Sequence, residues 1–113
     1  MKTLIYVSYN YGGWSLCFKK DVQLPFTPFY DMRLCFDGET SFHITNNKYT
    51  TSIIDYDLVK NEFLIEIRNN WLGGVRGDVV DDVFDIHSNW ERVDGTDVSK
   101  LKELMNRNHN VKF

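Results

Sequence analysis

The sequence predicts an α+β fold in a single domain, residues 1–113, in which an antiparallel β-meander of about six strands (residues 3–68) precedes one or two C-terminal helices. Three observations lead to this expectation. A chain of 113 residues has the usual size of one domain. Apolar and polar residues alternate with the period of a strand up to residue 68, and beyond it they recur with the period of a helix. Alanine, the best helix former, is absent, whereas asparagine occurs ten times.

The first two strands are predicted to form a hairpin around the glycine pair at residues 12–13. Glycine adopts the positive φ angles of a two-residue turn at little energetic cost. Such a turn places Tyr11 opposite Trp14 and Val7 opposite Phe18. Because both pairs are apolar, we expect one face of this hairpin to be buried.

Residues 22–28 contain both prolines of the chain, so they are expected to form an edge strand or an irregular crossing. A second hairpin follows, and its register comes from matching apolar faces. A three-residue loop at 37–39 places Phe42 opposite Leu34, whereas a two-residue loop would place it opposite Arg33. The pleat of the sheet therefore favours the three-residue loop.

The remaining strands of the meander follow turns at residues 46–47 and 57–61. The first of these turns consists of two asparagines, which tolerate positive φ angles. Matching apolar faces across the second turn places Ile53 opposite Ile65. The resulting sheet is expected to have an apolar inner face and a mostly polar outer face.

Two helices are predicted for the C-terminal part, at about residues 78–90 and 97–108, packed on one face of the sheet. In the first segment the apolar side chains lie on one side of a helix and the aspartates on the other, although its β-branched residues weaken the helical preference. In the second segment, Asp97 is expected to cap a helix whose apolar stripe includes Leu101 and Met105. The apolar sides of both helices must be buried, and we expect them to pack on the apolar face of the sheet.

The acidic balance of the chain argues against nucleic acid as a partner. The formal net charge is −3 at pH 7, whereas binding to phosphates requires clusters of basic residues. Residues 78–97 carry a local net charge of −6 and residues 98–113 one of +3, so these segments are expected to attract one another. No apolar run approaches the roughly 18 residues of a membrane span, and the N-terminus lacks the apolar centre of a signal peptide. We therefore expect a cytoplasmic protein without a membrane partner.

The first interpretation of function is a small non-enzymatic interaction protein. An acidic helix and the glycine-rich loop before it form the candidate surface, which would attract a protein partner with a basic surface. The tryptophan at the start of this loop is expected to be partly exposed, and such aromatic residues are common in interfaces. The candidate partner-binding residues are Trp71, Arg76, Asp78, Asp81, Asp82 and Asp85. Small size and a composition typical of AT-rich genomes fit an accessory protein of a phage or mobile element that inhibits a host protein.

The loop WLGGVRGDVVDD (residues 71–82) also suggests a phosphate-binding turn, because glycines precede the start of a helix. It lacks both the G-x-G-x-x-G pattern and the Gly-Lys-Ser/Thr ending of a P-loop. Asp78 is expected at the N-cap, where its carboxylate would occupy the free amide groups and repel an anion. The loop is therefore not predicted to hold a phosphate.

The alternative interpretation is binding or hydrolysis of a small, nucleotide-like anion on the polar outer face of the sheet. The expected register makes four polar residues lateral neighbours, and arginine presents a planar set of donors to phosphates and carboxylates. These candidate anion-binding residues are Arg33, His43, Thr50 and Arg68. A solvated sheet face is polar in any case, so the interaction protein is the preferred interpretation.

No catalytic set, cofactor site or metal site is predicted. The chain lacks the signatures of serine hydrolases and zinc proteases. The aspartates between residues 78 and 85 lack the further oxygen ligands that hard cations need, and two widely spaced cysteines indicate neither a disulfide framework nor a zinc site. His87 is expected on the apolar side of its helix, as a half-buried residue with satisfied hydrogen bonds. The oligomeric state is left open.

Overall fold

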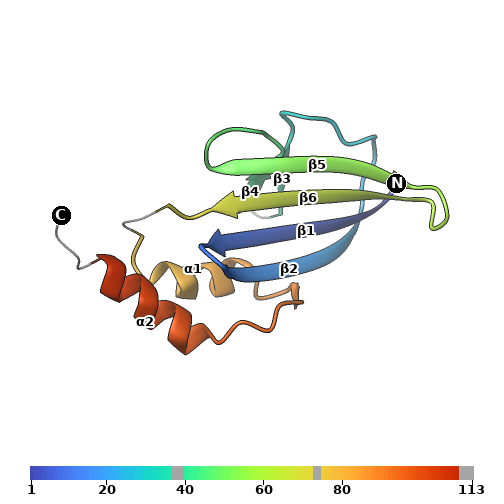
Figure 1. The fold of residues 1–113 in the computed structure, drawn as a ribbon. Coiled ribbons are helices and arrows are strands. Elements are labelled where there is room, and N and C mark those ends of the chain that lie inside the picture. Colours follow the sequence, from blue (N-terminus) through green and yellow to red (C-terminus); the bar gives the residue numbers. More distant parts are fainter. Residues whose placement is uncertain (37–39, 73–74, 110–113) are drawn as a thin grey trace.

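The computed structural model describes residues 1–36, 40–72 and 75–109 of an α+β protein (Figure 1). Its main sheet has five strands in the order β5-β6-β1-β2-β7, and β3 and β4 form a separate pair. The strands are β1 (Lys2–Tyr11), β2 (Trp14–Gln23), β3 (Arg33–Cys35), β4 (Ser41–His43), β5 (Thr50–Asp57), β6 (Glu62–Asn70) and β7 (Glu91–Arg92). The helices are α1 (Val79–Ile86) and α2 (Val98–His109). The predicted fold class, a mostly antiparallel sheet followed by two helices, is confirmed.

The registers of the first two hairpins agree with the prediction. Tyr11 lies opposite Trp14 across a turn in which Gly12 has a φ angle of 57°. Leu34 lies opposite Phe42 in the β3–β4 pair, although the loop that joins these strands lies partly outside the described residues. In both hairpins, turn chemistry and the alternation of apolar residues act between residues close in sequence.

The prediction of one continuous antiparallel meander is wrong, because the main sheet is mixed. β6 lies parallel to β1, with Ile65 opposite Ile5, so the last long strand pairs with the first (Figure 1). This arrangement buries both isoleucines completely at the centre of the sheet. Parallel neighbours require a crossover connection, and the chain between β1 and β6 supplies it.

The predicted pairing of β4 with β5 does not form. Side chains, and not the neighbouring strand, make hydrogen bonds with the backbone at this junction. The Ser52 N–H donates to Asn46 Oδ1 at 2.8 Å, and the Thr45 N–H donates to Ser52 Oγ at 3.0 Å. Asparagine and serine side chains compete with backbone pairing in this way. Ser52 is consequently buried, and the predicted pairing of Ile53 with Ile65 is wrong by one residue.

Both C-terminal helices are confirmed, with α1 shorter than predicted. The eight residues of α1 are followed by a turn, after which the chain adds β7 to the edge of β2. Each helix buries an apolar stripe: Val80 and Val83 belong to α1, and Leu101 and Met105 belong to α2. These four side chains join the core that the inner face of the main sheet forms.

The two predicted helix caps differ in outcome. Asp97 Oδ1 accepts the Lys100 N–H at 3.1 Å, as expected of an N-cap. Asp78 stands at the N-cap of α1 as predicted, but the predicted capping role is wrong, because its side chain makes no capping hydrogen bond. The carbonyls of Arg76 and Gly77 accept the first N–H groups of α1 instead. These amides are therefore occupied by a backbone turn, and they are not free to bind a phosphate.

Candidate functional site

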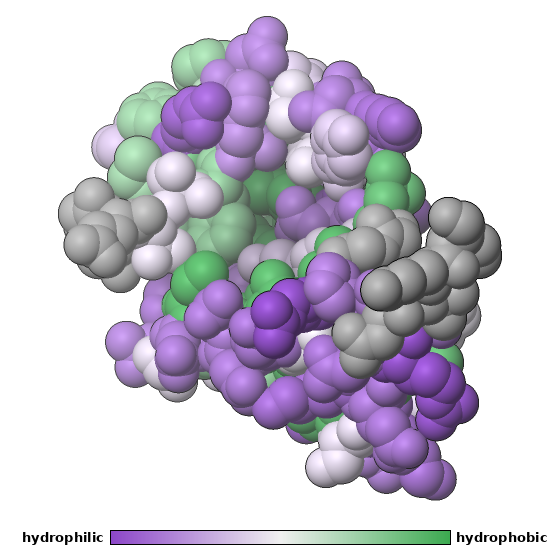
Figure 2. All heavy atoms as spheres, turned by 90° about the vertical axis from the view of Figure 1, so that its left-hand side faces the viewer, coloured by the Kyte–Doolittle hydropathy of each residue, from purple (hydrophilic) through white to green (hydrophobic). Residues whose placement is uncertain are grey.

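A cleft opens between the main sheet and the β3–β4 hairpin, at the end of the sheet where β1 and β6 finish. Its cavity measures about 480 Å³, a volume typical of small-molecule sites. Figure 2 looks onto this end of the molecule and shows a hollow with hydrophobic side chains inside and hydrophilic ones around it. We call the cavity the hairpin cleft; its polar lining is Arg33, Ser41, His43, Thr50 and Asn69, and its buried lining is Tyr9, Phe42 and Ile67.

The positive side of the hairpin cleft comes from the small two-stranded sheet. Arg33 on β3 lies opposite His43 on β4, and cross-strand side chains of this kind are ~5 Å apart. His43 Nε2 is 3.5 Å from Asp31 Oδ1. Arg33 is exposed, and no ion pair between described residues includes it. Its guanidinium is thus a cationic donor without a carboxylate partner in the described chain.

A row of three side chains crosses the main sheet beneath this hairpin. Thr50 on β5 lies opposite Asn69 on β6, and Asn69 lies opposite Tyr9 on β1. Thr50 Oγ1 donates to Asn69 Oδ1 at 3.4 Å, and Asn69 Nδ2 donates to the Ser8 carbonyl at 3.2 Å. The row is therefore held by hydrogen bonds to the sheet, and it presents a rigid wall to the cleft.

A second cavity lies on the far side of this row. It measures about 520 Å³, and we call it the tryptophan pocket; its lining is Tyr9, Tyr49, Thr50, Asn69, Asn70, Trp71, Leu72 and Val75. The Trp71 N–H donates to the Asn10 carbonyl at 2.8 Å, so this residue continues the parallel ladder beyond β6. The Trp71 ring is half-buried against the Tyr9 ring, with 5.3 Å between centroids. The sheet therefore fixes Trp71 in the wall of the tryptophan pocket.

The fourth candidate anion-binding residue, Arg68, lies elsewhere. It lines a hollow of about 230 Å³ with Tyr6, Ser8, Cys17 and Glu66, and Arg68 Nη2 donates to Glu66 Oε2 at 2.9 Å. Alternate residues of β6 face opposite sides of the sheet, so Arg68 is separated from Asn69 and the cleft. The expected row of four lateral neighbours is corrected to three residues around one cavity and one residue on the opposite face.

The floor of the cleft rests on a buried histidine that follows α1. His87 is 2% exposed, and its Nε2 lies 2.8 Å from the Tyr9 hydroxyl. Its ring is stacked on Phe18 with 4.5 Å between centroids. Among the described residues the Nδ1 atom has no hydrogen-bond partner, so the expectation of a half-buried, satisfied histidine is wrong. Burial lowers the pKa of His87 to about 4, and the imidazole is neutral at pH 7.

The acidic helix is partly neutralised within the molecule. Lys102 Nζ on α2 donates to both carboxylate oxygens of Asp81, at 3.0 and 2.9 Å, as the opposite local charges of the two segments predicted. Asp78 Oδ1 is 3.9 Å from Arg76 Nε. Asp82 and Asp85 are exposed and belong to no ion pair between described residues. The structure thus leaves two of the candidate aspartates without an internal counter-charge.

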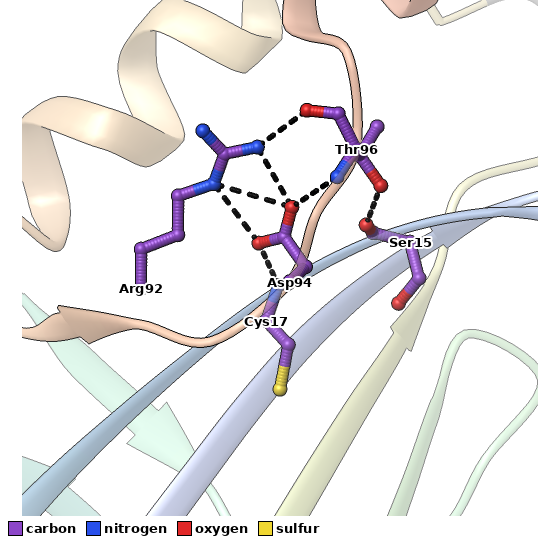
Figure 3. A network of polar contacts seen from close by, with 5 residues as sticks. All are labelled: Ser15, Cys17, Arg92, Asp94 and Thr96. Carbon is purple, nitrogen blue, oxygen red and sulfur yellow. Dashed lines mark hydrogen bonds and ion pairs between the residues drawn. The ribbon is translucent and has the colours of Figure 1, made fainter.

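Asp94 belongs to a network of hydrogen bonds that joins residues 92–96 to β2 (Figure 3). Asp94 accepts the Cys17 N–H at 2.9 Å and the Thr96 N–H at 3.0 Å, and Arg92 Nη2 donates to Asp94 Oδ2 at 2.8 Å. Thr96 Oγ1 donates to the Ser15 carbonyl. Burial alone would raise the pKa of Asp94, but the hydrogen bonds from Arg92, Cys17 and Thr96 outweigh burial and hold that pKa below its ordinary value.

The last glycine of the glycine-rich loop has a packing role. Gly77 is buried, and its N–H donates to Asn106 Oδ1 at 2.8 Å. A Cβ atom at this position would lie 2.6 Å from the Lys102 carbonyl oxygen. Gly77 therefore permits the close approach of α2. The other two glycines of the loop, at positions 73 and 74, lie outside the described residues.

Sequence reasoning missed Tyr9 and Asn69 as cleft residues. Their alternation in β1 and β6 indicates which face they share, but only the parallel pairing of these strands makes them neighbours. Within the described ranges, no helix is long and apolar enough to cross a membrane, and no group of three or more histidine, cysteine or acidic residues could hold a metal ion. Comparisons with protein families, curated proteins and solved structures found no match.

Proposed function

We propose that the protein binds a small anionic ligand in the hairpin cleft. The observation that carries this proposal is the meeting of Arg33, His43 and Thr50, from three different strands, around one cavity of about 480 Å³. Sequence reasoning ranked anion binding second and expected it on the polar outer face of the sheet, whereas the cleft lies on the inner face, which Tyr9 and Ile67 share with the core. We now place it first because the acidic helix is partly neutralised by Lys102, whereas Arg33 has no carboxylate partner among the described residues.

The chemistry of the cleft suits a phosphate or a carboxylate. A guanidinium offers several donors in one plane and forms strong charge-assisted hydrogen bonds with such groups. His43 and Thr50 add a ring nitrogen and a hydroxyl to the same lining, which also includes the buried ring of Phe42. Asp31, which is 3.5 Å from His43, places one negative charge beside this set, so the ligand is expected to approach from the Arg33 side.

Arg33→Ala is expected to weaken anion binding by about tenfold to a hundredfold, because hydrogen bonds to charged groups contribute roughly 1.5–3 kcal/mol. Arg68→Ala is the matched control, since it removes an arginine from the opposite face of the sheet. Isothermal titration calorimetry with inorganic phosphate and with mononucleotides measures both variants. Equal losses in the two variants, or no heat from any anion with the unchanged protein, would contradict the proposal.

A second candidate function is binding of a protein partner through α1, as in an inhibitor encoded by a phage or mobile element. The exposure of Asp82 and Asp85 favours it, because uncompensated carboxylates attract a basic surface over several ångströms. Asp78 and the exposed Arg76 lie at the start of the same helix. Trp71 is less suited to this role, since the sheet holds its half-buried ring against Tyr9.

Replacing Asp82 and Asp85 together by lysine is expected to lower capture of a basic partner about tenfold or more, because like charges would then face each other. Glu103→Lys is the control, since it reverses an exposed charge on α2, where Glu103 pairs with Arg107. Quantitative mass spectrometry of proteins captured from a host lysate gives the comparison. A partner retained equally by the double variant and the control would exclude this surface.

A further inference from the structure

The hairpin cleft and the tryptophan pocket share one wall. Tyr9, Thr50 and Asn69 line both cavities, and they form the continuous row across β1, β6 and β5. The two cavities therefore lie on either side of one row of side chains, at the same end of the main sheet. A ligand that passes over this row contacts both of them.

The two cavities differ in chemistry. The hairpin cleft contains Arg33 and His43, whereas the tryptophan pocket adds a large aromatic ring and aliphatic side chains. In the tryptophan pocket, Tyr49 is 57% exposed and Leu72 is 41% exposed. A flat apolar group that covers these surfaces would remove them from water, which is favourable. The combined site thus has a cationic part and an aromatic part.

The spacing of the two parts follows from β6. Ile67 lines the hairpin cleft, Asn69 belongs to the shared row, and Trp71 lines the tryptophan pocket. These alternate residues face the same side of the sheet, and the N–H of Trp71 keeps this segment in the ladder by donating to the Asn10 carbonyl. From Ile67 to Trp71 this extended chain measures roughly 13 Å, so the two cavities are neighbours along β6 and one small ligand reaches both.

We infer that the two cavities form a single bipartite site for a mononucleotide, with the phosphate beside Arg33 and the base against Trp71. This inference rests on the proposed anion-binding function and specifies its ligand class. Bases stack on aromatic side chains with little dependence on base identity, and the guanidinium recognises the phosphate. The hydrogen-bonded side chains of Thr50 and Asn69 lie between the two ends, where the sugar passes over them.

The test compares four probes by isothermal titration calorimetry: adenosine monophosphate, adenosine, ribose 5-phosphate and inorganic phosphate. Adenosine monophosphate is expected to bind about fivefold to a hundredfold more tightly than ribose 5-phosphate, because stacking of one base contributes roughly 1–3 kcal/mol. Trp71→Ala should remove that gain and leave ribose 5-phosphate binding unchanged. Trp71→Phe, which keeps an aromatic ring and the fold, should retain most of the gain. Arg33→Ala should weaken both phosphate esters and leave adenosine binding unchanged.

The outcomes separate this inference from the function on which it rests. If adenosine monophosphate and ribose 5-phosphate bind equally, and Arg33→Ala weakens both, the bipartite site is overturned while anion binding stands. If no phosphate compound binds the unchanged protein, both are overturned. A loss in Trp71→Ala that is the same for all four probes would also overturn the bipartite site, because it would reflect damage to the fold and not lost stacking.

Discussion

Asp94→Ala is expected to lower the free energy of unfolding by about 3 kcal/mol, because it leaves two backbone N–H groups without their acceptor. The Asp94 side chain is 7% exposed, and it accepts the N–H groups of Cys17 and Thr96. Beyond β7 the Val93 N–H still donates to the Cys17 carbonyl, and the Asp94 carboxylate accepts the Cys17 N–H in place of a backbone carbonyl. Its loss also removes the ion pair with Arg92, whose Nη2 keeps its hydrogen bond to the Thr96 carbonyl. Urea denaturation of the two proteins gives the difference.

Two further variants test the cause of this loss. Glu91→Ala removes an exposed acid of β7 that lies 3.5 Å from Lys19 Nζ, and it is expected to cost less than about 1 kcal/mol, as surface ion pairs do. The loss of stability in Asp94→Asn should lie between those of Glu91→Ala and Asp94→Ala, because the amide oxygen of asparagine still accepts hydrogen bonds. A loss of the same size for Glu91→Ala and Asp94→Ala would show that charge, and not the buried hydrogen bonds, stabilises this edge.

Acidification from pH 7 to pH 4 is expected to lower the free energy of unfolding by about 3 kcal/mol, because burial disfavours the protonated form of His87 in the folded protein. The pKa of His87 is about 4 in the folded protein and ~6.5 in an unfolded chain, and each unit corresponds to about 1.4 kcal/mol. Between these two values the unfolded state binds a proton that the folded state does not, so stability falls as the pH falls. The contribution is complete above pH ~6.5 and is lost through pH ~4.

The double variant Tyr9→Phe, His87→Phe removes both partners of the buried hydrogen bond and isolates this effect. Replacing both hydrogen-bonding groups by apolar ones destabilises a protein less than removing one and leaving the other buried without a partner. The stability of the double variant should vary less between pH 7 and pH 4 than that of the unchanged protein, as measured by urea denaturation at each pH. Parallel pH profiles would contradict the assignment to His87. Asp94 contributes at lower pH, because its pKa lies below that of an ordinary carboxyl.

Much of the local structure was predictable because it depends on residues close in sequence. The turn at Gly12 sets the register of the first hairpin, and Asp97 caps the second helix through a residue three positions away. The charges of α1 and α2 also indicated the contact between Asp81 and Lys102. Each of these features follows from turn chemistry, periodicity or charge, none of which depends on which distant segments pack together.

The candidate site was only partly predictable. The opposition of Arg33 and His43 follows from hairpin register, and it is confirmed. Arg68 was grouped with them because β5 was expected to pair with β6 in the register that places Ile53 opposite Ile65. The buried hydroxyl of Ser52, which donates to the Thr45 carbonyl at 2.8 Å, belongs to the other register. In that register Ile54, and not Ile53, lies opposite Ile65, so two adjacent isoleucines left the alternation ambiguous and the hydrogen bonds of Ser52 accompany the register that forms.

The sequence by itself determined the fold class, the registers of the first two hairpins, and the approximate positions of both helices. The tertiary structure alone decided that β6 lies parallel to β1, and hence that Tyr9 and Asn69 stand side by side between two cavities. The physical reason is that side-chain alternation specifies which face of a strand is buried but not which distant strand lies beside it. That choice depends on how the whole core packs, and it is what brings Trp71 to the same end of the sheet as Arg33.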